Sequence, residues 1–268
     1  MLTPEQIGRF YRQWRPSDVH RSWPQLWNKH YRIRVQDDIF IKLNKHRSRL
    51  GFDSLRRLCL EYAPGNIYMS VLNWMMPERV GDKRASVGAY PIGGEYVIDI
   101  DSYLNYKKHN HHTEDGVCEG CLEGSKQLTE RFIDEVKQNY SDLRIVFSGK
   151  SGFHIHVLDF EVRDWVRYDE RYPLRSHAAA RFMYSTILND SVKGFDRHHF
   201  ILSSDVLRVI TFPESLNGET GLVCSHLGGA IEFNSLKVYE ILEGAKSAKG
   251  LTSGFNFVSA DKIRKIII

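Results

Sequence analysis

The chain has 268 residues, of which 42% are hydrophobic and 26% charged, and its formal net charge is +4. This ordinary globular composition excludes a disordered, collagen-like or coiled-coil chain. No apolar run approaches the roughly 20 residues that a membrane helix needs. The polar start lacks a signal-peptide core, so we predict an intracellular protein, in the cytoplasm and nucleoid or in the nucleus, that is neither secreted nor membrane-bound. We predict a single domain over residues 1–268.

In chain order, the patterns predict an α+β fold with mixed, antiparallel-rich sheets flanked by helices. The first helix carries a capping box, because Gln6 stands three residues after Thr3. Helices are predicted at 3–15, 54–63, 126–140, 173–189 and 235–245. Strands are predicted at 37–43, 66–74, 95–101, 143–149, 153–160, 230–234 and 262–268. Residues 195–221 mix strand and helix signals, and 102–124 form a long irregular insertion, which inside a compact domain is typically functional or disordered.

The charge is unevenly spread along the chain. Residues 1–60 hold 13 lysines and arginines against 5 acidic residues, a net +8, and the remainder carries a net −4. Aromatic residues are interleaved with these cations, a pattern that suits a nucleic-acid backbone. The alternative interpretation is a solvated basic surface over an aromatic core.

Two carboxylates, Asp99 and Asp101, end a short apolar strand. Residues i and i+2 of a strand share a face, so these side chains emerge together. Adjacent carboxylates repel each other unless a cation lies between them, and oxygen ligands suit Mg²⁺ or Mn²⁺. The pair is therefore a candidate metal site, although two solvated surface acids would give the same pattern.

A turn of small residues at 148–152 joins two predicted strands. Backbone N–H groups in such a turn can face a phosphate, and Lys150 adds a positive charge. His154 and His156 share one strand face, so both could point at a ligand. The spacing is not that of a Walker A loop, and a plain hairpin is the alternative. The candidate nucleotide-binding residues of this segment are Ser148, Gly149, Lys150, Ser151 and His154.

The irregular segment carries His111 and His112, followed by Cys118 and Cys121 in a C-x-x-C pair. Thiolate and imidazole ligands in a short polar loop suit a closed, tetrahedral structural zinc site. His109 is a competing ligand, and a reduced loop without metal is the alternative. A thiol redox pair is disfavoured, because a redox C-x-x-C normally opens a helix within a βαβ pattern.

Taken in order, these motifs resemble the catalytic small subunit of archaeal and eukaryotic DNA primase, over most of residues 30–225. QDDIFIKL and PGNIYMS resemble the segment that leads to the family's catalytic strand, and YVIDID resembles the strand itself. The His–Cys segment follows where the family carries a zinc knob, with His111 and His112 in place of two adjacent cysteines. VFSGKSGFHIHV resembles the S-G-x-x-G-x-H signature, and LRVITFPESLNGETGL resembles a segment ending R-L-P-x-S-L-H-x-K-T-G-L.

This resemblance implies a primase-polymerase catalytic core with a zinc-binding loop insertion at 102–124. It implies template-directed nucleotidyl transfer with two Mg²⁺ or Mn²⁺ ions and one structural Zn²⁺. Asp99 and Asp101 would hold the ions with a third carboxylate, for which Asp196 is the first candidate and Asp205 the second. Further nucleotide-binding residues would be Arg47, Arg208 and Asn217, the last in place of the family's histidine.

The implied substrates are a single-stranded DNA template and nucleoside or deoxynucleoside triphosphates. A primase large subunit is the expected partner, because the chain extends little beyond the catalytic core. A free-standing primase-polymerase of a mobile element or of a repair or CRISPR system is the alternative. A further alternative is a non-catalytic, zinc-containing nucleic-acid-binding module, which would need no acidic pair.

Overall fold

The computed structural model describes residues 2–14, 23, 26–35, 39–46, 50–80, 91–100, 117–160, 200–202 and 207–245. The helix predicted at 173–189 and the strand predicted at 262–268 lie outside these residues. The single domain predicted over residues 1–268 stays a prediction. The α-helices are α1 (Pro4–Gln13), α3 (Phe52–Tyr62), α4 (Glu119–Val136), α6 (Ala230–Ser235) and α7 (Val238–Ala245). Short 3-10 turns are η1 (Leu26–Asn28), η3 (Leu43–His46) and η4 (Pro77–Arg79). The strands are β1 (Lys29–Arg34), β2 (Phe40–Lys42), β3 (Asn66–Trp74), β4 (Pro91–Gly94), β5 (Tyr96–Ile100), β6 (Leu143–Phe147), β7 (Phe153–Val157), β8 (Phe200–Leu202) and β9 (Val209–Thr211).

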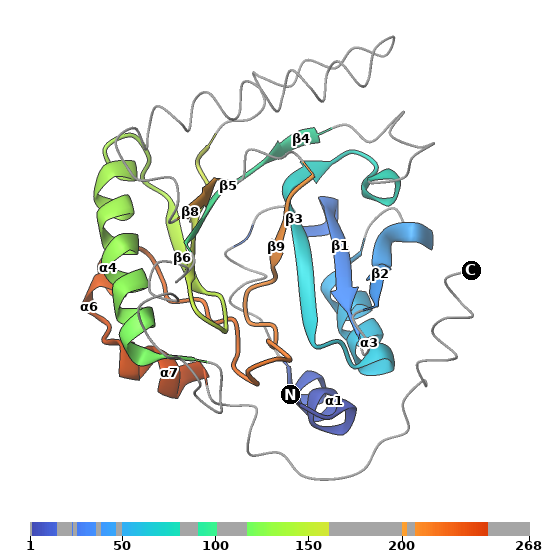
Figure 1. Ribbon diagram of the computed structural model, residues 1–268. Coiled ribbons are helices and arrows are strands. Elements are labelled where there is room, and N and C mark those ends of the chain that lie inside the picture. Colours follow the sequence, from blue (N-terminus) through green and yellow to red (C-terminus); the bar gives the residue numbers. More distant parts are fainter. Residues whose placement is uncertain are drawn as a thin grey trace.

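The strands form two sheets in which every described pair is antiparallel. The first sheet has the order β2-β1-β3-β4, and β9 also pairs with β3. The second has the order β6-β7-β5-β8. Helices α4 and α6 lie along the second sheet, α7 packs against α4, and α1 and α3 lie beside the first sheet (Figure 1). The predicted α+β class with antiparallel sheets and flanking helices is confirmed.

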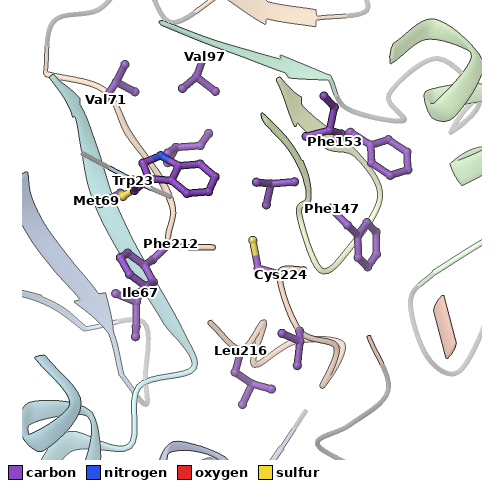
Figure 2. Close-up of a cluster of buried hydrophobic side chains, with 14 of the residues drawn as sticks. Trp23, Ile67, Met69, Val71, Val97, Phe147, Phe153, Phe212, Leu216 and Cys224 are labelled. Atoms are coloured by element: carbon purple, nitrogen blue, oxygen red, sulfur yellow. The ribbon is translucent and has the colours of Figure 1, made fainter. Parts of the chain in front are cut away.

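A hydrophobic core fills the space between the two sheets. Met69 and Val71 from β3 face Val97 from β5, and Trp23 lies between them (Figure 2). Because side chains alternate along a strand, Val97 and Asp99 point to this inner face of β5, whereas Ile98 points to the opposite face. The inner face is therefore apolar in its middle and becomes polar where β5 ends.

A buried polar cluster crosses this core and connects the sheets. Lys29 Nζ on β1 donates to Glu95 Oε1 at 2.7 Å and to the Val71 carbonyl oxygen at 2.6 Å. Glu95 Oε2 accepts from Trp23 Nε1 at 2.8 Å and lies 2.9 Å from His156 Nδ1. All four side chains are buried. Burial alone would raise the pKa of Glu95, but Lys29 and His156 outweigh it and lower the pKa to about 2.

Several elements agree closely with their sequence patterns. Thr3 is the N-cap of α1, and its capping box with Gln6 is present. Strand β3 has the predicted bounds, and the hairpin of β6 and β7 lies where the small-residue turn indicated. Strand β2 covers only part of the predicted 37–43, because the chain turns into η3 at Leu43.

Two predicted elements are wrong. The sequence predicts a strand at 230–234, but these residues form helix α6, whose N-cap is Gly229 and whose Glu232 side chain accepts from the Gly229 N–H. The irregular segment was expected to reach residue 124, but α4 already begins at Glu119. The first turns of α4 bury small and polar side chains such as Ser125, so hydrophobic periodicity did not mark their start.

Candidate active site

The central carboxylate of the site is Asp99, on the inner face of β5. In the sheet Asp99 is paired with His154 of β7, so their side chains lie on the same face. Asp99 Oδ2 accepts a hydrogen bond from Arg208 Nη2 at 2.6 Å, and Asp99 Oδ1 lies 3.5 Å from His154 Nε2. Asp99 is only 8% exposed, so this pairing matters: a buried carboxylate needs a partner. Among the described residues, no hydrogen-bond partner reaches His154 Nδ1 or Arg208 Nε.

The turn between β6 and β7 is closed by its own serine. The Ser148 N–H donates to the Gly152 carbonyl oxygen at 2.9 Å, and Ser148 Oγ accepts from the Gly152 N–H at 3.2 Å. Gly149 has φ of +78°, a conformation that favours glycine. This arrangement leaves the Lys150 side chain on the outside of the turn, half-exposed.

A second loop, residues 217–222, is fastened to this turn. Thr220 Oγ1 donates to the Gly149 carbonyl oxygen at 2.6 Å, and Asn217 Oδ1 accepts from the Glu219 N–H at 3.1 Å. Gly218 crosses the backbone of Gly65, to whose carbonyl oxygen the Gly218 N–H donates at 2.8 Å. The loop is thereby positioned against both sheets.

Replacement of Gly218 by alanine should destabilise this crossing. A Cβ at this position would lie 2.6 Å from the Gly65 Cα, which is backbone and cannot rotate away. We expect Gly218→Ala to lower the free energy of unfolding by about 1–3 kcal/mol, as overpacking does. Gly120→Ala is a matched control, because the nearest atom to its Cβ, Cys118 Sγ, is 3.9 Å away. Equal denaturant midpoints for the two variants would contradict the expectation.

These segments surround a pocket of about 240 Å³. It brings together seven predicted residues: Asp99, Ser148, Lys150, Ser151, His154, Arg208 and Asn217. Gly149 shapes the turn. Sequence reasoning missed the contribution of the first sheet, which consists of Arg34, Asn66, Tyr68, Val209, Ile210 and Thr211, and it also missed Glu219. The predictions for Arg47, Asp101, His111, His112, Asp196 and Asp205 lie outside the described residues.

The pocket is strongly polar, and its charges are partly paired. Glu219 bridges Arg34 and Lys150, and the hydrogen bonds from Lys150 and then Arg34 lower the pKa of Glu219. Burial lowers the pKa of His154 to about 4, although Asp99 acts in the opposite direction. His156 shares the face of His154 as predicted, but it bonds to Glu95 and lines no part of the pocket.

The two cysteines of the predicted zinc site lie at the start of α4. Cys118 is the N-cap and Cys121 stands in the first turn, so the C-x-x-C pair opens a helix, contrary to our expectation. Burial and a hydrogen bond with Cys118 raise the pKa of Cys121 to about 11, opposite to the shift that activates a thiol. Within the described ranges no group of three or more His, Cys, Asp or Glu side chains is placed to hold a metal.

Fold and site together define an α+β protein with an acidic strand end and a cationic turn in one pocket, the arrangement expected for binding a polyphosphate. By sequence the chain is similar to archaeal DNA primase small subunits, which confirms the resemblance seen in its motifs. DNA primase small subunit PriS of Pyrobaculum arsenaticum is 29% identical, over 68% of this chain and 66% of that protein. PriS of Methanothermobacter thermautotrophicus is 27% identical, over 73% and 61%.

The similarity has defined limits. The matched region spans less than two thirds of the length of these relatives. A shorter region is 35% identical to PriS of Methanocaldococcus jannaschii, over 39% of this chain and 31% of that protein. No family profile matches the chain. Among solved structures, the polymerase domain of Mycobacterium tuberculosis ligase D in complex with DNA gives a TM-score of 0.49 at 13% identity, covering 88% of this chain and 86% of that one.

No helix in the described part of the chain is long and apolar enough to cross a membrane.

Proposed function

We propose that this chain is a template-directed nucleotidyltransferase, the catalytic small subunit of a DNA primase. The observation that carries the proposal is the pocket in which the Asp99 carboxylate lies beside the Ser148 turn, Lys150 and Arg208. A nucleotidyltransferase needs such a combination, because it must hold the anionic triphosphate next to oxygen ligands for divalent cations. The similarity to proteins named DNA primase small subunit supports the same assignment.

The metal requirement fits the donor chemistry of the pocket. Within the described residues, Asp99 Oδ1 lies 3.5 Å from His154 Nε2. This carboxylate oxygen is a hard ligand that suits Mg²⁺ or Mn²⁺. In the proposal, two ions are held by Asp99, by Asp101 and by either Asp196 or Asp205. When bound, such ions lower the pKa of the attacking hydroxyl and stabilise the leaving pyrophosphate.

The remaining pocket residues act on the triphosphate. Ser148 Oγ accepts from the Lys150 and Gly152 N–H groups, so its own O–H can donate to a phosphate oxygen, and Lys150 provides a mobile positive charge. Arg208 gives one N–H to Asp99 and has further N–H groups for a phosphate, as a planar guanidinium can bind two anions. Asn217 stands where the related family has histidine, and its side-chain oxygen already accepts from the Glu219 N–H.

Zinc is proposed as a structural ion, not a catalytic one. Cys118 and Cys121 lie within hydrogen-bonding contact of each other at the start of α4, so both sulfurs are close enough to bind one ion. His111 and His112 would complete the four ligands and leave no open position for chemistry. The ion would fasten the polar segment before α4 to the helix.

The decisive experiment is primer synthesis on single-stranded DNA with Mn²⁺ or Mg²⁺ and nucleoside triphosphates. We expect metal-dependent primers, with initiation strengthened by a primase large subunit. Long DNA products from deoxynucleotides without any partner would favour the free-standing primase-polymerase. DNA binding without incorporation under any of these conditions would favour a non-catalytic module and refute the proposal.

Lys150→Gln should raise the KM for the nucleoside triphosphate by about tenfold, since one charge-assisted hydrogen bond of about 1.5–3 kcal/mol is lost. The Lys150 side chain is half-exposed and its partner in the described structure is Glu219, so the fold should be unaffected. Lys137→Gln is a matched control, because Lys137 forms a similar exposed pair with Asp134 on α4. Equal KM values for both variants would exclude Lys150 from the triphosphate site.

A further inference from the structure

One carboxylate in the pocket is bound to the cations that a triphosphate would need. Glu219 Oε1 accepts from Arg34 Nη1 at 2.6 Å, and Glu219 Oε2 accepts from Lys150 Nζ at 2.6 Å. Arg34 belongs to β1 in the first sheet, and Lys150 belongs to the turn between β6 and β7 in the second. Glu219 therefore spans the pocket and joins the two sheets through one anion.

The backbone that carries Glu219 is well anchored, but its side chain is accessible. The neighbouring Thr220 is bonded to Gly149, and the Glu219 N–H is bonded to Asn217. The Glu219 side chain itself is 34% exposed, and Lys150 is 50% exposed. Rotation of the Glu219 side chain could thus release both cations without any change in the loop.

Carboxylates and phosphates compete for the same partners. Both are anions that accept charge-assisted hydrogen bonds from guanidinium and ammonium groups. A phosphate that reaches Arg34 and Lys150 must therefore displace the Glu219 carboxylate. The hydrogen bonds from Lys150 and Arg34 lower the pKa of Glu219, so the competing anion is fully charged at neutral pH.

We propose that Glu219 is an intrinsic competitor for the phosphate-binding cations, which weakens the binding of polyphosphates and returns to Arg34 and Lys150 when pyrophosphate leaves. The proposal rests on the proposed function, because it assumes that the pocket binds a triphosphate. Glu219 is a specificity-determining residue in this view. The binding free energy that a ligand obtains from Arg34 and Lys150 is reduced by the free energy of the ion pairs with Glu219 that it must break. The dissociation constant of a nucleoside without phosphates should not depend on Glu219.

The test compares wild-type protein with Glu219→Gln, which keeps the size of the side chain and removes its charge. Dissociation constants for ATP, pyrophosphate and adenosine are measured by calorimetry with Ca²⁺, which permits binding without turnover. We expect Glu219→Gln to bind ATP and pyrophosphate about tenfold more tightly, equal to about 1.4 kcal/mol, and to bind adenosine as the wild type does. Glu61→Gln on α3 is the matched control, because it makes the same change in net charge away from the pocket.

The gain should also depend on the cations. In an Arg34→Gln background, removal of the Glu219 charge should tighten ATP binding by much less, because one of the two contested groups is missing. A wild type that binds ATP and a folded Glu219→Gln that binds it no more tightly would overturn the inference and leave the proposed function standing. Failure of both proteins to bind ATP would overturn the proposed function and this inference together. Equal tightening by Glu61→Gln would assign the effect to net charge and overturn the inference.

Discussion

Primer synthesis should fall by at least about 10²–10³-fold when Asp99 and Asp101 are both replaced by alanine, the scale on which one lost electrostatic stabiliser lowers kcat. In the proposed mechanism the change removes two carboxylate ligands of the divalent ions. It also frees Arg208 from its 2.6 Å bond to Asp99, so triphosphate can still bind to a cationic pocket. We therefore expect a large loss in kcat with a small change in the KM for nucleotide, measured by primer synthesis at saturating Mn²⁺.

Two controls separate catalysis from folding. Asp99→Asn keeps the shape of the side chain and an oxygen that accepts from Arg208, so its fold should match the wild type while its activity is lost. Asp134→Ala removes an exposed carboxylate of α4 whose salt-bridge partner is Lys137, and its activity should be unchanged. Normal primer synthesis by a folded Asp99→Ala, Asp101→Ala protein would refute the two-metal mechanism.

Apart from Arg208 and Asn217, which the family resemblance supplied, the parts of the fold and site that could be predicted are those whose signals are local. The turn that begins at Ser148 requires small residues within the five positions 148–152, and the start of α1 requires only a capping box. Both can therefore be predicted from a short stretch of sequence. Asp99 could be predicted because its strand is apolar and its acidic neighbour is two residues away. Each of these features depends on residues close in the sequence.

The missed parts depend on contacts between distant residues. Strand β1 begins with a lysine, Lys29, so its sequence does not have the pattern of a buried strand. Lys29 is buried because its Nζ pairs with Glu95 Oε1 at 2.7 Å, and Glu95 is 66 positions away in the sequence. Without β1 there was no reason to place Arg34 in the pocket. Glu219 was likewise passed over, since its importance comes from Arg34 and Lys150, at separations of 185 and 69 positions.

Replacement of Glu95 by glutamine should have the largest effect on stability. Glu95 is the only carboxylate bonded to Lys29 Nζ among the described residues, and both side chains are about 2% exposed. The variant leaves a buried cation without a counter-charge, which typically costs about 3–5 kcal/mol. We expect a loss of that size in the free energy of unfolding, measured by urea denaturation at pH 7.

The cause can be separated from packing by removing both charges. The double variant Lys29→Met, Glu95→Gln should be more stable than Glu95→Gln alone, because it leaves no unpaired charge in the core while the glutamine still offers an oxygen to Trp23 Nε1. The exposed pair of Lys137 and Asp134 offers the comparison, since removing either partner should cost at most about 1 kcal/mol. A double variant no more stable than Glu95→Gln would show that the buried charge does not cause the loss.

The same pair predicts a pH dependence of stability. The pKa of Glu95 is lowered to about 2 in the folded chain from an ordinary value of 4.5, so its contribution is complete above pH 4.5 and disappears as the pH falls towards 2. In the unfolded chain the carboxyl binds its proton first as acid is added, so protons shift the equilibrium towards unfolding. The free energy of unfolding of the wild type should decline over this window, and Glu95→Gln should decline less steeply. Parallel slopes for the two proteins between pH 4.5 and 2 would mean that Glu95 keeps its ordinary pKa in the fold, and that Lys29 does not hold it as an anion.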